Sequence, residues 1–95
     1  MEKIVSREEL FNAIDKCNFF SASRKNTLKT LINNANTKNI VTAKLQIMAE
    51  EACQTKATFC CNRKRLEEDQ LLDYLSYGRR KIYKINMDKV NLFVD

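Results

Sequence analysis

The sequence predicts an α+β domain that is mainly helical and carries one small β-hairpin. Apolar residues recur at helical spacing in four segments between residues 7 and 69, and aromatic and branched residues flank the sole glycine, Gly78. A length of 95 residues is enough for one hydrophobic core and too short for two. We therefore expect one domain with an N-terminal helical extension over 1–19, a core over 20–85 and a short C-terminal helix over 86–95.

The first two predicted helices are marked by capping residues. Ser6 begins a capping box, in which its hydroxyl and the glutamate three residues later bond backbone amides at the start of a helix over 7–17. A second helix starts at Ser21 or Ser23, because either hydroxyl can accept a hydrogen bond from the first turn. The polar stretch 33–36 suits a turn, so we expect the second helix to end there.

Two further helices are expected after a short β-type segment at 39–41. Thr42 is predicted to cap a third helix, whose apolar residues recur at helical spacing as far as Ala52. Thr55 is predicted to cap a fourth helix over about 56–69. The chain therefore predicts two consecutive helices that flank a short turn.

The predicted hairpin follows the fourth helix. Its strands cover 71–77 and 79–85, which contain branched and aromatic residues, and its tip covers 76–79. Gly78 is predicted to act as a turn residue rather than as a ligand contact, because glycine adopts backbone conformations that other residues avoid.

Positive charge is unevenly distributed along the chain, which carries a net charge of +5. Residues 20–48 contain five basic residues and no acidic one, and residues 56–65 and 79–84 are also basic and free of acids. Such clusters favour an anionic partner, with nucleic acid ahead of acidic lipid. The alternative is a solvated basic face without a partner.

The composition argues against an enzyme and against a bound metal. Histidine is absent, which removes the commonest general base and the commonest metal ligand. The four cysteines form no Cys-x-x-Cys pair, so we expect no metal and no other cofactor. We expect Cys17 and at least one of Cys60 and Cys61 to pack as small buried hydrophobes.

No apolar run approaches the length of a membrane-spanning helix, so no membrane partner is expected. The first residues include acids where a secretory signal would be apolar. We therefore expect a cytoplasmic, nucleoid-associated protein.

The segment 42–72 resembles the winged helix-turn-helix family without a gap. Its Met-Ala-Glu-Glu, Thr-Lys-Ala-Thr-Phe and Arg-Leu-Glu-Glu-Asp-Gln-Leu-Leu stretches are similar to that family's Leu-Ala-Glu-Glu, Ser-x-x-Thr-Val and Arg-Leu-Glu-Glu-x-Gly-Leu-Leu. The Tyr-Gly-Arg-Arg stretch at 77–80 looks like the tip of the family's wing. The resemblance covers about residues 37–90 and is closest to modules of bacterial regulators and of plasmid and phage replication proteins.

The resemblance implies a winged helix-turn-helix with an extra N-terminal helix that binds nucleic acid, expected to be duplex DNA. The fourth helix would enter the major groove, and the wing would contact the flanking backbone or the minor groove. The implied role is transcription regulation or replication of a mobile element. The expected contact residues are Thr42, Lys44, Thr55, Lys56, Ala57, Thr58, Cys61, Arg65, Tyr77, Arg79, Arg80 and Lys81.

Four departures from the family pattern lie in the turn between the third and fourth helices and on the buried face of the fourth helix. Cys53 and Gln54 replace a glycine and an apolar residue in the turn, and Asn62 and Arg63 replace alanine and leucine on the buried face. Arg63 would either contact the DNA backbone or pair with a glutamate on its own helix. These departures keep an alternative function open, namely a non-enzymatic accessory subunit that binds a larger replication or regulatory protein and binds single strands weakly. A homodimer also remains open.

Overall fold

The computed structural model describes residues 7–78 and 80–94, and it bears out the α+β class. Among these residues, no helix has both the length and the apolar character that crossing a bilayer requires. Ser6, the first residue of the expected capping box, lies outside the described residues. The elements in chain order are α1 (Arg7–Lys16), α2 (Ala22–Asn33), β1 (Ile40–Val41), α3 (Leu45–Glu51), α4 (Lys56–Glu68), β2 (Leu72–Tyr77), β3 (Arg80–Ile85) and α5 (Met87–Val94).

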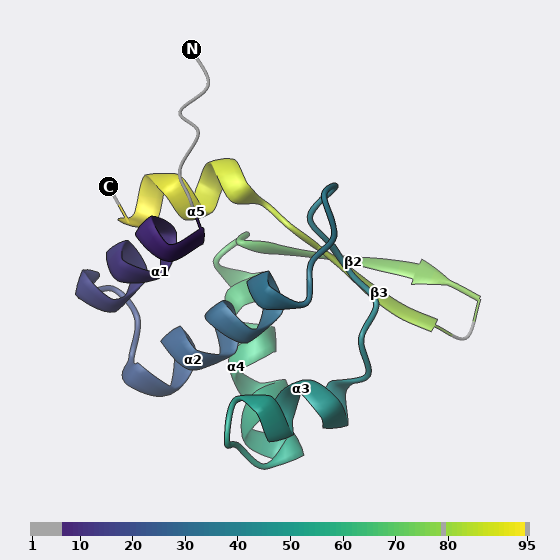
Figure 1. Cartoon of the computed structure of the whole chain (residues 1–95). Coiled ribbons are helices and arrows are strands. Elements are labelled where there is room, and N and C mark those ends of the chain that lie inside the picture. Colours follow the sequence, from purple (N-terminus) through teal and green to yellow (C-terminus); the bar gives the residue numbers. More distant parts are fainter. Residues whose placement is uncertain (1–6, 79, 95) are drawn as a thin grey trace.

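The three strands form one antiparallel sheet in the order β1-β3-β2. Figure 1 shows the β2–β3 hairpin extending away from the helices on one side of the molecule. Tyr77 pairs with Arg80, so the connection lies one residue later than the tip expected over 76–79. Gly78 has a φ of 61°, which confirms its expected role as a turn residue.

One hydrophobic cluster joins all the described helices and strands. Leu10 and Ile14 of α1 are buried in it together with Val90 of α5, and α1 contacts both α2 and α5. Helix α1, in the described part of the expected N-terminal extension, is therefore packed into the core. The other buried apolar members are Phe20, Leu28, Leu31, Ile32, Val41, Met48, Ala49, Ala52, Phe59, Leu66, Leu71, Leu72, Tyr83 and Ile85.

The helix starts agree with two of the three caps that the described residues test. The Ser21 hydroxyl accepts a hydrogen bond from the first turn of α2, and the Thr55 hydroxyl does the same for α4. The expected cap at Thr42 is wrong, because α3 begins after Lys44, whose side chain makes no capping bond. Val41 pairs with β3, and Lys44, with a ψ of 140°, is the extended residue that directly precedes α3. Thr42 therefore lies two residues before the cap position.

Among residues 7–78 and 80–94, three residues other than glycine adopt left-handed backbone conformations. Asn39, Cys53 and Gln70 have φ values of 64°, 56° and 65°. Asparagine tolerates this region, whereas most other side chains cost roughly 1–2 kcal/mol there. Cys53 and Gln70 occupy the two positions at which the winged helix-turn-helix pattern has glycine. The backbone at both positions therefore has the conformation for which glycine is the favoured residue.

We expect the Cys53→Gly and Gln70→Gly substitutions each to raise the free energy of unfolding. Relief of the left-handed strain outweighs the extra chain entropy that glycine loses on folding, which leaves a gain of about 0.5–1 kcal/mol. Urea unfolding measures this gain. Asn39→Gly is the control and should change stability less, and a loss of stability in both test variants would contradict the assignment of strain.

Candidate nucleic-acid interface

α3 and α4 are joined by a turn that the backbone itself holds closed. Cys53 reverses the chain through its left-handed conformation, and the backbone amide of Gln54 donates to the Ala49 carbonyl at 2.9 Å. The backbone amide of Thr58 then donates to the Thr55 hydroxyl at 3.1 Å. These bonds fix where α4 begins relative to α3.

A cluster of polar side chains ties α4 and the turn to α2. The Thr27 hydroxyl donates to Gln54 Oε1 at 2.9 Å, and Gln54 Nε2 donates to the Ser23 carbonyl at 2.9 Å. Asn62 Nδ2 donates to Ser23 Oγ at 2.8 Å and lies 3.2 Å from Thr27 Oγ1. We call these four residues the polar bridge. Because Thr27 is fully buried, its hydroxyl needs these partners.

The polar bridge accounts for two of the four departures from the family pattern. Gln54 and Asn62 are polar where the family has apolar residues, and both bond the same two residues of α2. Asn62 therefore faces another part of this chain rather than a surface available to a protein partner. The sequence shows that both replacements are polar, and a polar side chain on a buried side of a helix needs a hydrogen-bond partner.

Arg63 is held at the contact between α4 and the sheet. Its guanidinium lies 2.9 Å from Glu67 Oε1 and 5.1 Å from the centre of the Tyr83 ring. Its side chain is 9% exposed, so of the two roles expected for Arg63 the structure shows pairing with a glutamate of α4. Phe59 and Leu66, on the same side of α4, are fully buried.

Tyr83 on β3 packs beneath α4 and beside Tyr74 of β2. The two rings meet edge to face with their centres 5.5 Å apart, and Tyr74 is 48% exposed. The Tyr83 hydroxyl is buried without a hydrogen-bond partner among the described residues. Burial raises the pKa of Tyr83 above its usual value of 10.0, and the positive charge of Arg63 opposes part of this rise.

This raised pKa predicts an alkaline loss of stability. The contribution of Tyr83 is fully present below the unfolded-state pKa of about 10, and it is lost as the pH rises through the higher folded-state pKa. We expect the free energy of unfolding to fall less steeply above about pH 10 in Tyr83→Phe than in the wild type, as measured by urea unfolding at several pH values. Tyr74→Phe should keep the wild-type slope, and an unchanged slope in Tyr83→Phe would contradict the prediction.

The side of α4 that faces away from the core, with its margins, carries five of the twelve expected contact residues. Phe59, Arg63 and Leu66 form the buried side, and Asn62 joins the polar bridge. Most of the other residues in the first turns of α4 are exposed, and we call the surface that they form the outer face. The outer face and its margins contain the exposed residues Lys56, Ala57, Thr58, Cys61, Lys64 and Arg65.

Three more expected contact residues lie just before α3 and α4. Thr42 and Lys44 are exposed in the segment that connects β1 to α3, and the Lys44 carbonyl accepts the first backbone bond of that helix. Thr55 is exposed at the start of α4, where its hydroxyl is already used as the cap. Thr55 therefore fixes the helix start as well as lying near the outer face.

Three of the four expected wing residues, Tyr77, Arg80 and Lys81, lie at the end of the hairpin. In the backbone register, Tyr77 pairs with Arg80 and Lys81 pairs with the residue before Tyr77. Arg79 lies outside the described residues, and the side chains of the other three lie outside what the structure describes. Their position is therefore known from the backbone of the hairpin alone.

Two basic residues of the 20–48 segment are used within the fold. Lys29 forms an ion pair with Asp15 at 2.7 Å, and Lys25 donates to the Asp15 carbonyl at 2.6 Å. Both lysines therefore tie α2 to the last turn of α1. Part of the positive charge of this segment therefore serves to hold α2 against α1.

The cysteines are spread over the fold rather than gathered at a site. Cys53 and Cys61 are exposed, whereas Cys17 and Cys60 are half-buried and Cys17 packs against the core. Within residues 7–78 and 80–94, no group of three histidine, cysteine, aspartate or glutamate side chains is placed to hold a metal ion. The expected burial of Cys17 and Cys60 is thus only partial.

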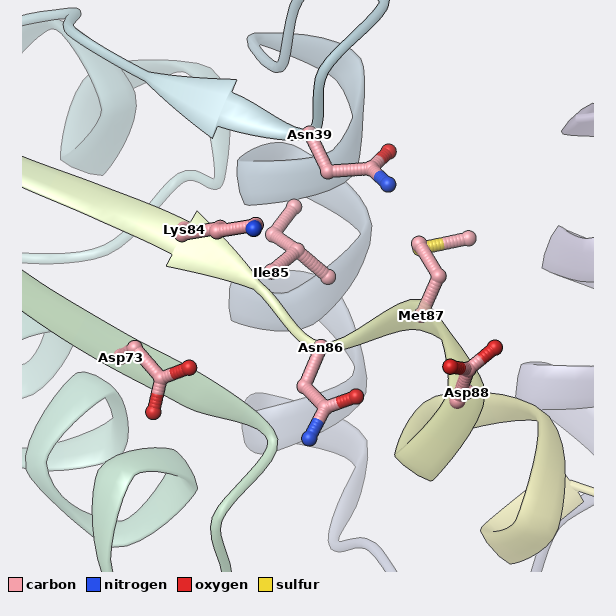
Figure 2. Close-up of a pocket in the computed structure, with 7 residues that line it drawn as sticks. All are labelled: Asn39, Asp73, Lys84, Ile85, Asn86, Met87 and Asp88. Atoms are coloured by element: carbon pink, nitrogen blue, oxygen red, sulfur yellow. The ribbon is translucent and has the colours of Figure 1, made fainter.

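An open hollow of about 360 Å³ lies where the sheet meets α5 (Figure 2). Its charged residues are Asp73, Lys84 and Asp88, so it offers both signs of charge. The residues that line it come from the approach to β1, from β2 and β3, and from the start of α5. It is therefore separate from the outer face of α4.

No model of a protein family matches the chain, and no curated protein or solved structure does so. The candidate interface is accordingly defined by its own residues. These are the outer face of α4, the segment before α3 and the end of the hairpin.

Proposed function

We propose that this chain binds duplex DNA as a winged helix-turn-helix module, in transcription regulation or in replication of a mobile element. One observation carries the proposal: the outer face of α4 combines the exposed cations Lys56, Lys64 and Arg65 with small side chains. A helix with such a face fits the major groove, where cations reach phosphates and short side chains approach base edges. The polar bridge and Arg63 hold the opposite side of α4 rigidly in the fold.

The order of elements supports the same proposal. The helix pair α3 and α4 precedes a hairpin that ends in basic residues, and β1 pairs with that hairpin. In this arrangement Arg79, Arg80 and Lys81 contact flanking phosphates or the minor groove, and Tyr77 lies beside them. Thr42 and Lys44 supply a further phosphate contact ahead of α3.

Duplex binding by the full chain should weaken steeply with salt. We expect the logarithm of the association constant to fall against the logarithm of salt concentration with a slope of about −4 to −7, since about five to eight phosphates are contacted. Fluorescence anisotropy with a labelled duplex measures this slope. A slope near zero, or no duplex binding at low salt, would contradict the proposal.

An accessory subunit that binds a larger replication or regulatory protein is the second candidate. This candidate can be tested at Leu92 of α5, which at 75% is the most exposed of the large apolar side chains that the structure describes. Figure 1 shows α5 and α3 at opposite ends of the molecule. Light scattering shows whether the chain self-associates, for example through α5, or is a monomer. A monomer that does not bind duplex DNA would favour the accessory role over the DNA-binding role.

A further inference from the structure

The centre of the outer face of α4 is apolar in its first two turns. Successive residues of a helix are rotated by about 100°, so Ala57 and Cys61 lie on one line, one turn apart and opposite the buried Phe59 and Leu66. Both residues are exposed. Lys56 lies on the line of the helix that also carries the buried Arg63. Lys56 is therefore at the margin of the outer face and not at its centre.

The side chains at this centre are poorly suited to hydrogen bonding with bases. Alanine has no polar side-chain atom, and a thiol is only a weak donor and acceptor. Thr58, beside them, accepts a hydrogen bond from the Thr55 hydroxyl at 3.0 Å. The paired donors and acceptors with which arginine, asparagine and glutamine recognise guanine or adenine are absent from Ala57, Thr58 and Cys61.

We propose that α4 recognises the methyl groups of thymine, an inference that rests on the proposed binding of duplex DNA. The 5-methyl group of thymine is the apolar feature that the major groove presents, and small apolar side chains contact it. Ala57 and Cys61 are separated by about 6 Å along the helix, close to the ~7 Å spanned by two base-pair steps. The two side chains therefore meet methyl groups about two base pairs apart, while Lys64 and Arg65 on the next turn bind phosphates.

The test compares duplexes that differ only in the methyl group. Four duplexes of about 21 base pairs are used, with alternating A·T, A·U, G·C or G·5-methylcytosine pairs, and the full chain is titrated by fluorescence anisotropy. We expect A·U to bind about three- to tenfold more weakly than A·T, and 5-methylcytosine to strengthen binding to G·C by a similar factor. Equal affinities within both pairs would overturn the inference and leave the proposed function standing. Absence of binding to all four would instead refute the proposed function.

Three variants separate methyl recognition from differences in duplex shape. Cys61→Asn places a polar amide on the exposed centre and should bring the ratio of A·T to A·U affinity close to one. Lys56→Ala should weaken binding to both duplexes while leaving that ratio at its wild-type value. Ala57→Gly removes the other apolar contact and should also lower the ratio. Thermal unfolding checks that each variant is folded. A wild-type ratio in both Cys61→Asn and Ala57→Gly would overturn the inference.

Discussion

In a Lys56→Ala/Arg65→Ala double variant, affinity for duplex DNA should fall about 10- to 100-fold at an ionic strength near 0.1 M. Both side chains are exposed cations of α4, and each is expected to neutralise one phosphate. The salt dependence should therefore become shallower by about two units of slope. Anisotropy titrations at several salt concentrations measure both effects.

The matched control is Lys25→Ala/Lys29→Ala, which lowers the net charge by the same amount. Both of these lysines contact Asp15 at the end of α1, so they are engaged away from α4. We expect this control to change affinity by less than about threefold, through long-range attraction alone. Equal losses in the two double variants would show that binding depends on total charge rather than on α4.

Arg63→Ala should destabilise the fold by about 3 kcal/mol, because it breaks a largely buried ion pair and a cation–π contact. The guanidinium of Arg63 lies 2.9 Å from Glu67 and 5.1 Å from the Tyr83 ring centre, between α4 and the sheet. Its removal leaves a gap and a glutamate without its partner. Urea unfolding near neutral pH measures the loss.

Arg63→Leu is the informative comparison. Replacing a buried ion pair by a well-packed apolar residue is often neutral, and leucine is the residue of the winged helix-turn-helix pattern at this position. We expect the leucine variant to lie within about 1 kcal/mol of the wild type. If alanine and leucine cost the same, the charge of Arg63 rather than its packing volume would be what stabilises the contact.

Features that depend on neighbouring residues were predictable from the sequence. The Ser21 and Thr55 caps each involve residues within one helical turn, and both are confirmed. The turn role of Gly78 is local as well, and it is confirmed by a φ of 61°. The expected cap at Thr42 is wrong because α3 starts after Lys44, whose side chain makes no capping bond and so left no local signal in the sequence.

The exposed residues of the candidate site were predictable from the sequence. The hydrogen bonds that hold α4 in place were not. Lys56 and Cys61 follow from helical spacing once α4 is placed. Asn62 bonds Ser23, which lies 39 residues away, and Gln54 bonds the same residue across 31 positions. Sequence shows that these side chains are polar, and only the packed helices show which partner each one reaches.

The burial of α1 has a consequence for how this protein can be joined to others. Leu10 and Ile14 fill space beside Val90, so both ends of the described chain meet on one side of the fold. A fragment that began at α2 would expose the apolar core residues that α1 now covers. Helix α1 therefore belongs to the same folded unit as α2 to α5.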